Sequence, residues 1–172
     1  MSKDSLALES ARLRLRELRN DDAPFILKLL NDPAFIQYIG DRKVRTLEQA
    51  GQYIVHGPAA SYRDHGFGLL LVELKSGGTP IGMCGLLQRN YLPDPDIGFA
   101  YLPDYRSQGF AKEAANAVIE DATKKKMNRL LAIVQPDNAS SLKLLASLGF
   151  DAGRTFKVAA GDETLLLLTR KR

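Results

Sequence analysis

The segment from Leu102 to Ala111 has the residues of a turn that binds an anion. It follows a short apolar run and precedes a helical pattern, so it joins the end of a strand to the start of a helix. The first N–H groups of a helix have no partner inside it, and the helix dipole adds positive charge there. Gly109 and Ala111 let backbone approach a phosphate closely, and Arg106 adds a cation. The segment indicates a phosphate site, and an ordinary turn with a capping glycine also fits its spacing.

A second segment, Asn138 to Phe150, reads Asn-x-x-Ser-x-x-Leu-Leu-x-x-Leu-Gly-Phe. Asn138 is a good helix N-cap, Ser141 lies in the first turn, and Gly149 is typical of a helix end. Each of these features also fits a capped helix without a ligand. Two other phosphate fingerprints, G-x-x-x-x-G-K-[ST] and G-x-G-x-x-G, do not occur in the chain.

Together and in this order, the two segments resemble the GNAT superfamily of acyl-CoA-dependent N-acetyltransferases. Arg106-x-x-Gly109-x-Ala111 is similar to its R/Q-x-x-G-x-G/A pyrophosphate signature, and Asn138-x-x-Ser141 before Leu-Gly-Phe is similar to its second cofactor motif. Three further stretches resemble the RimJ/RimL branch: Leu8 to Arg16 followed by Asp21-Asp22, then Asp96-Ile97-Gly98-Phe99, then Phe110 to Ala114. The resemblance extends from about Leu8 to Thr169.

The resemblance implies that acetyl-CoA is the co-substrate and lies in a wedge between two splayed strands. The strand before the signature would pair its backbone with the pantetheine arm, through Phe99, Ala100, Tyr101 and Leu102. The turn would hold the pyrophosphate mainly by backbone N–H groups, from Arg106, Ser107, Gln108, Gly109, Phe110, Ala111 and Lys112. Asn138 and Ser141 would contact the cofactor near the second strand.

The reaction that the resemblance implies is direct attack of an amine on the thioester, with backbone N–H groups stabilising the developing oxyanion. The amine must lose a proton, and Asp96 is the candidate base because it occupies the acidic position before Gly-Phe. A solvated loop carboxylate is the other interpretation of Asp96, and Glu113 is a second candidate base. Leu145 replaces the tyrosine that many members carry. Tyr101 is therefore the candidate acid, although a strand tyrosine is more often a packing residue.

The amine acceptor stays open between a protein N-terminal amine, as in ribosomal-protein acetylation, and a small-molecule amine. Five aspartates flank loops expected to form its pocket: Asp32, Asp41, Asp64, Asp94 and Asp96. They would draw a cationic amine, although scattered acidic residues are more often solvated surface residues. A non-catalytic acyl-CoA-binding or sensor module is the alternative function, because the tyrosine is missing. A nucleic-acid-binding domain would rest on net charge alone.

The elements that must position these residues alternate between strand and helix. Strands are expected over residues 12–16, 67–74, 80–88, 96–102, 129–135, 156–160 and 164–169. Helices are expected after Asp21-Asp22 and over residues 46–62, 109–126 and 138–148, with Gly57-Pro58 weakening the second of these. The predicted fold class is α/β, with a GNAT-like mixed, centrally splayed sheet of about seven strands and helices on both faces.

Length and composition fit a single domain spanning residues 1–172. The 172 residues are close to one domain's worth of chain, and the formal net charge of +4 favours an anionic partner without requiring nucleic acid. One cysteine excludes an intrachain disulfide, and with only two histidines no metal site is expected. The chain has no signal-like start and no membrane-length apolar run. We therefore expect a cytoplasmic monomer or homodimer without membrane or nucleic-acid partners.

Overall fold

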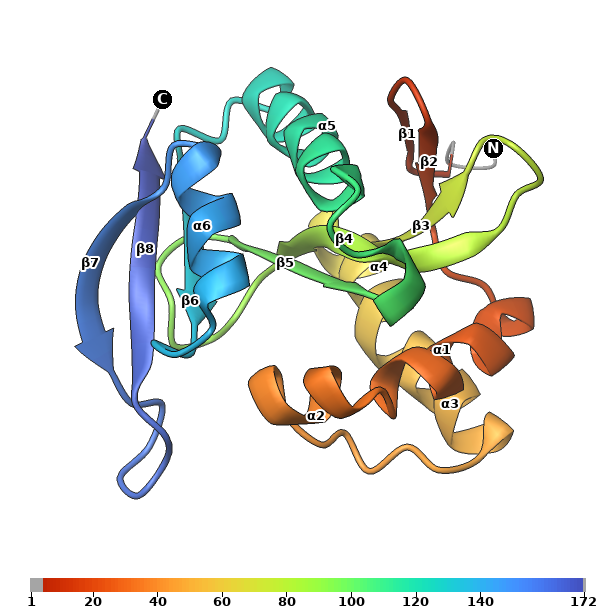
Figure 1. The fold of residues 1–172 in the computed structure, drawn as a ribbon, viewed down its shortest axis with the longest axis horizontal. Coiled ribbons are helices and arrows are strands. Elements are labelled where there is room, and N and C mark those ends of the chain that lie inside the picture. The colour runs from red at the N-terminus through yellow and green to blue at the C-terminus, as the bar shows by residue number, and fades with distance from the viewer. Residues whose placement is uncertain (1–4, 172) are drawn as a thin grey trace.

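The computed structural model describes residues 5–171, whose strands form one eight-stranded mixed sheet (Figure 1). The spatial order is β1-β2-β3-β4-β5-β6-β8-β7, and β5–β6 is its parallel pair. The strands are β1 (Ala7–Glu9), β2 (Leu13–Arg16), β3 (Leu69–Leu74), β4 (Pro80–Leu87), β5 (Asp96–Tyr101), β6 (Arg129–Val134), β7 (Asp151–Phe156) and β8 (Leu165–Lys171).

Helices cover both faces of this sheet. One face carries α5, and the helices between β2 and β3 lie against the other face (Figure 1). The helical elements are η1 (Asn20–Asp22), α1 (Ala23–Leu30), α2 (Pro33–Tyr38), α3 (Leu47–Ile54), η2 (Val55–Ala59), α4 (Ala60–His65), η3 (Pro103–Tyr105), α5 (Phe110–Lys124) and α6 (Ala139–Ser147). In the part of the chain that the structure describes, no helix combines the length and apolar character needed to cross a bilayer.

Two buried clusters fill the space between the sheet and its helices. The cluster under α5 includes Ala114 and Val118 of the helix with Cys84 and Ile97 of the sheet. The cluster on the opposite face holds α1 and α3 against Met83 and other residues of the strands. Because side chains alternate along a strand, β4 and β5 contribute to both clusters. These two cores fix the central strands from above and below.

The parallel neighbours β5 and β6 touch at one end and separate toward the other. Their register contains the single residue pair Asp96 and Leu131, and the Leu131 N–H donates to the Pro95 carbonyl at 2.9 Å. In contrast, β4 pairs with β5 from Asp96 through Tyr101. The backbone of Phe99 to Tyr101 is therefore paired with β4 on one side and has no strand partner on the side that faces β6.

The structure corrects two expected elements and adds others. The expected strand 156–160 lies instead at Asp151–Phe156, and the residues after it form the turn to β8, where Val158 is 45% exposed. Gly57-Pro58 does not end the expected helix, because a five-residue π-helical turn, Val55–Ala59, accommodates the proline. Two short elements, β1 and α2, were not expected, because they have too few residues to show a recognisable hydrophobic period. With β1 included, the sheet has eight strands rather than the expected seven or so.

Candidate active site

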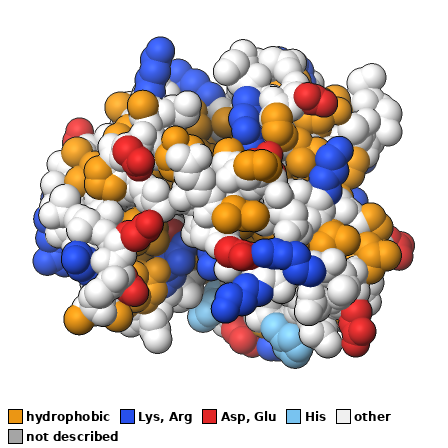
Figure 2. Space-filling model, turned by 60° about the horizontal axis from the view of Figure 1, so that its bottom comes forward, with side chains coloured by type: hydrophobic (Ala, Val, Ile, Leu, Met, Phe, Trp, Pro, Cys, Tyr) orange, Lys and Arg blue, Asp and Glu red, His pale blue; other side chains and the backbone are white. Residues whose placement is uncertain are grey.

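A large cleft opens where β5 and β6 separate. Its volume is about 970 Å³, and its walls come from α2, the β4–β5 connection, β5, the start of α5, β6 and α6. In Figure 2 a hollow divides the left part of the molecular surface from the right part. The two segments that the sequence indicates as a cofactor site meet in this cleft.

The turn before α5 presents an uncapped helix start to the cleft. The first helical hydrogen bond runs from the Glu113 N–H to the Gly109 carbonyl at 3.1 Å, and the N-cap residue Gly109 offers no side chain. The N–H groups of Phe110, Ala111 and Lys112 are consequently not used within the helix. Gly109 has φ +82° and so adopts the left-handed conformation that glycine favours. This arrangement suits an anionic oxygen ligand.

Arg106 does not extend freely into the cleft as an isolated cation. Its NH2 group donates to Asp32 Oδ2 at 2.6 Å, and its Nε and NH2 groups donate to the Tyr101 carbonyl at 3.0 and 2.8 Å. Asp32 is also the N-cap of α2 and accepts from the Phe35 N–H. The guanidinium therefore joins the end of β5 to the start of α2, which leaves the backbone of the turn and Lys112 as its groups available for an anion.

The second segment also begins a helix beside the cleft. Asn138 Oδ1 accepts a hydrogen bond from the Ser141 N–H at 3.3 Å, which makes Asn138 the N-cap of α6 as its chemistry predicts. Both side chains line the cleft. Two helix starts, those of α5 and α6, thus flank the opening between the splayed strands.

Asp96 lies at the closed end of the splay, where β5 and β6 are still paired. Asp96 is only 1% exposed to solvent, and Arg89 Nε donates a hydrogen bond to its Oδ1 at 2.8 Å. Burial raises the pKa of Asp96 above its ordinary value, and the adjacent Arg89 opposes that shift. Asp96 is therefore a buried, charge-paired carboxyl that lines the cleft and not a solvated loop residue.

Tyr101 and Glu113 lie in less suitable places for proton transfer. The Tyr101 hydroxyl is buried without a hydrogen-bond partner among the described residues, and burial beside the Cys84 thiol raises its pKa well above the usual value. It points to the α5 face, opposite to Asp96 by the alternation of β5. Glu113 accepts from Ser10 and Arg12, and these bonds outweigh burial and lower its pKa.

The cleft brings together most of the residues that the sequence indicates. Of the expected cofactor residues, all line it except Leu102, which packs in the core below the sheet, and Gln108. The sequence analysis missed other residues of the cleft walls, because they belong to no recognisable motif: Tyr38, Ile39, Arg42, Tyr53, Arg89, Tyr91, Gln135 and Leu165.

Comparison with known proteins decides the family. A family model described as an acetyltransferase (GNAT) domain matches residues 12–151. The chain belongs to the GNAT acetyltransferase family. It is 28% identical over 146 residues to the uncharacterized N-acetyltransferase YoaA of Bacillus subtilis, which covers 83% of this chain and 81% of that protein.

Solved GNAT structures share the fold over nearly the whole chain. An acetyltransferase from Agrobacterium tumefaciens has a TM-score of 0.81 at 23% identity, covering 100% of this chain and 96% of that one. RimL, a ribosomal L7/L12 alpha-N-protein acetyltransferase solved with coenzyme A, has a TM-score of 0.82 at 16% identity, covering 96% of this chain and 98% of RimL. The expected family, fold and RimJ/RimL likeness are confirmed, and the chain is an acetyl-CoA-dependent N-acetyltransferase.

The GNAT cofactor fits the geometry of this cleft. Acetyl-CoA has a diphosphate, which suits the uncapped start of α5, and amide groups along its pantetheine arm, which suit the open backbone edge of β5. Lys112 and Lys143 add positive charge to the same walls. The cleft therefore offers matching groups to the diphosphate and to the pantetheine amides.

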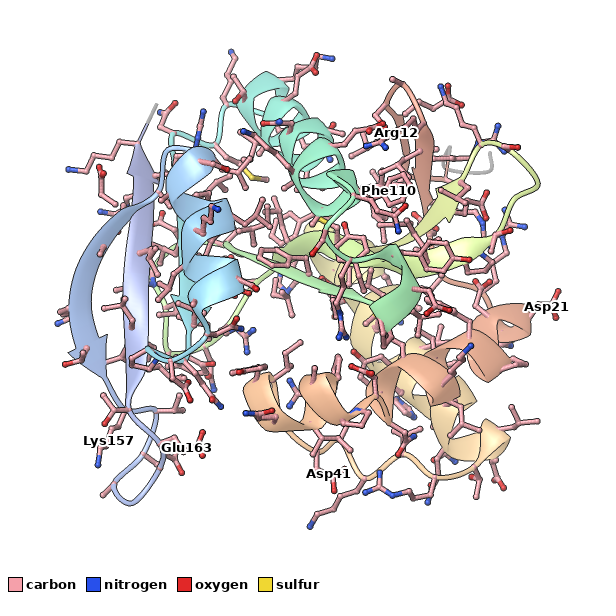
Figure 3. All side chains as sticks on the ribbon, in the orientation of Figure 1. Arg12, Asp21, Asp41, Phe110, Lys157 and Glu163 are labelled. Atoms are coloured by element: carbon pink, nitrogen blue, oxygen red, sulfur yellow. The ribbon has the colours of Figure 1, made fainter. Side chains whose placement is uncertain are left out.

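Arg12 holds the turn that precedes α5. Its NH1 and NH2 groups donate to the Gln108 carbonyl, both at 3.2 Å, and its Nε donates to Glu113 Oε2 at 2.8 Å. Its guanidinium also lies over the Phe110 ring, 4.3 Å from the centroid (Figure 3). Arg12 therefore orients the peptide before Gly109 and neutralises the acidic side chain nearest the anion site.

Replacing Arg12 with glutamine should raise the KM for acetyl-CoA about tenfold while kcat changes much less, because the turn loses an anchor and Glu113 loses its counter-ion. Steady-state kinetics with varied acetyl-CoA measures both constants. Arg14→Gln is the control, since Arg14 lies two residues further along and its ion pairs are longer, at 3.5 and 3.8 Å. Equal KM values for the wild type and the Arg12 variant would contradict this positioning role.

Proposed function

We propose that the protein transfers the acetyl group of acetyl-CoA to a primary amine by direct attack in a ternary complex. The acceptor is a protein N-terminal amine or the amine of a small molecule. The observation that carries the proposal is the splay of β5 from β6, with one paired residue at its closed end and a helix start at its open end. A cofactor lying along this splay would have its diphosphate at α5 and its thioester toward Asp96.

The cofactor residues in this proposal are those that line the splay. The backbone of Phe99, Ala100 and Tyr101 pairs with the pantetheine amides, and the N–H groups from Ser107 to Lys112 bind the diphosphate. Asn138 and Ser141 hold the arm from the α6 side. The support for these assignments is that the open edge of β5 and the uncapped start of α5 belong to the same cleft.

Asp96 is the base in the proposed reaction. Arg89 occupies its Oδ1, which leaves Oδ2 to accept a proton from the attacking amine. The new C–N bond forms as the thioester C–S bond breaks. The amine proton passes to the carboxylate of Asp96, and CoA leaves as the thiolate. The side chain that returns a proton to the thiolate is left unassigned, because the Tyr101 hydroxyl is buried on the opposite face of the sheet.

A thiol-release assay tests the proposal. Acetyl-CoA is incubated with the protein and a panel of peptides, diamines, amino sugars and amino acids, and released CoA is quantified together with the acetylated product. Amine-dependent release with matching product supports the enzyme. Tight binding of acetyl-CoA by calorimetry, without release across the whole panel, would instead favour the acyl-CoA sensor.

A further inference from the structure

The sequence predicts that five aspartates attract a cationic amine. In the structure, an arginine pairs with each of these aspartates and neutralises its charge. Each forms an ion pair with an arginine, at N···O distances from 2.5 to 3.0 Å. The pairs are Asp32 with Arg106, Asp41 with Arg45, Asp64 with Arg63, Asp94 with Arg129, and Asp96 with Arg89. The expectation that these acids draw a cationic amine therefore lacks support, since each of them is paired with an arginine.

The walls of the cleft carry more positive than negative side chains. Among the described residues that line it, the negatively charged side chain is Asp96, whereas the positively charged ones are Arg42, Arg89, Arg106, Lys112 and Lys143. Arg89 and Arg106 are paired with Asp96 and Asp32, so the positive charges without an ion-pair partner among the described residues are Arg42, Lys112 and Lys143. Arg106, Lys112 and Lys143 belong to the turn, α5 and α6, which form the cofactor end. Arg42, between α2 and α3, and Arg89, after β4, remain for the acceptor end.

Arg42, Arg89 and Tyr53 all line the same cleft. Burial raises the pKa of Tyr53, and the positive charges of Arg42 and Arg89 act against that rise. Arg42 is exposed and forms no ion pair with another described residue. Arg89 is fixed by Asp96 at 2.8 Å and by the Tyr91 hydroxyl at 3.1 Å, so its Nε and NH1 groups are used.

We infer that Arg42, Arg89 and the Tyr53 hydroxyl form an anion-binding subsite, and that the acceptor is a primary amine carrying a carboxylate or phosphate group. The inference rests on the proposed acetyl transfer. The guanidinium of Arg42, the remaining NH2 group of Arg89 and a phenol are donors that recognise such oxyanions. The amine of the same molecule then lies toward Asp96, so the acceptor end would bind a zwitterion and discriminate against diamines and other polycations.

The class of acceptor is tested with three compounds of matched chain length: an amino carboxylate, its carboxamide and the corresponding diamine. The set of three is repeated at several spacer lengths. The wild type should acetylate the amino carboxylate with a kcat/KM about tenfold or more above that of the carboxamide, and the diamine should be poorer still. An aminoalkyl phosphonate series distinguishes a phosphate-bearing acceptor from a carboxylate-bearing one. A preference for the diamine or the carboxamide would overturn the inference while leaving acetyl transfer intact.

Charge reversal at Arg42 tests the residues. Arg42→Glu should abolish the preference for the amino carboxylate and improve the diamine, with an unchanged KM for acetyl-CoA. Lys43→Glu is the control, because Lys43 is also exposed, undergoes the same change in charge and does not line the cleft. An unchanged acceptor preference in the Arg42 variant would overturn the subsite.

Calorimetry provides a measurement that does not need turnover. The amino carboxylate is titrated into the protein saturated with CoA, and Arg42→Glu should weaken its binding about tenfold or more. Equal binding by the wild type and the variant would contradict the subsite even if transfer occurs. Conversely, Arg42-dependent binding without any acetylated product would contradict the proposed function and leave the anion subsite standing.

Discussion

Replacing Asp96 with asparagine should lower kcat by about a hundredfold or more at pH 7, because the amine then loses its proton acceptor. At high pH the acceptor is largely neutral before it binds, so the variant should recover most of the lost rate. The wild type needs the ionised carboxyl, and its rate should fall as the pH drops through the pKa of Asp96. Since burial raises that pKa, the fall should begin above the range of an ordinary aspartate.

The pH dependence of kcat between pH 5 and 10 measures this effect. Asp94→Asn is the matched control, because Asp94 is also paired with an arginine, at 2.5 Å from Arg129, but does not line the cleft. The thermal stability of both variants separates a catalytic loss from the structural cost of leaving Arg89 without its counter-ion. Parallel profiles for the wild type and the Asp96 variant would reject Asp96 as the base.

The second large effect is expected at the start of α5. Gly109→Val should weaken acetyl-CoA binding at least tenfold, because a β-branched residue is strained at φ +82° and its Cβ would lie 3.3 Å from the NH2 group of Arg12. Relief of this strain moves the backbone N–H groups that receive the diphosphate. The change is measured as the Kd for acetyl-CoA by calorimetry.

Gly77→Val separates binding from stability. Gly77 has almost the same backbone angle, φ +83°, but lies in the β3–β4 hairpin outside the cleft. Both substitutions should destabilise the protein, by about 1–3 kcal/mol from backbone strain, as measured by chemical denaturation. The Gly109 variant alone should lose affinity for acetyl-CoA, and unchanged affinity would argue against the diphosphate site at this turn.

The cofactor end of the cleft was largely predictable from local sequence. Gly109 and Asn138 fulfil conformational roles that depend on a few neighbouring residues, and the pattern of strand, turn and helix around them is short. The alternation of Leu13 and Leu15 with arginines likewise predicts β2, and both leucines are fully buried. Local chemistry is sufficient to predict how a helix begins.

The ion pairs around the cleft were not predictable, because their residues become neighbours only through tertiary contacts. Asp32 and Arg106 are 74 positions apart in sequence, and no local pattern indicates that the cation of the anion-binding turn pairs with the cap of α2. The interpretation of the five aspartates as a cationic-amine attractant failed for the same reason, since their arginine partners cannot be recognised from spacing. The strand β7 lies at Asp151–Phe156 and not at the predicted residues 156–160. Its position is set by pairing with β8, and the apolar residues around Val158 lie outside this pairing.

The separation of β5 from β6 gives the sheet two internal edges in addition to its outer edges at β1 and β7. An exposed edge strand carries unpaired N–H and C=O groups and tends to pair with other chains. Here these groups face one another across a cleft that α2, α5 and α6 help to enclose. The protein can therefore add an extended, amide-bearing guest to its sheet without offering the same edge to another polypeptide, which combines ligand capture with protection against aggregation.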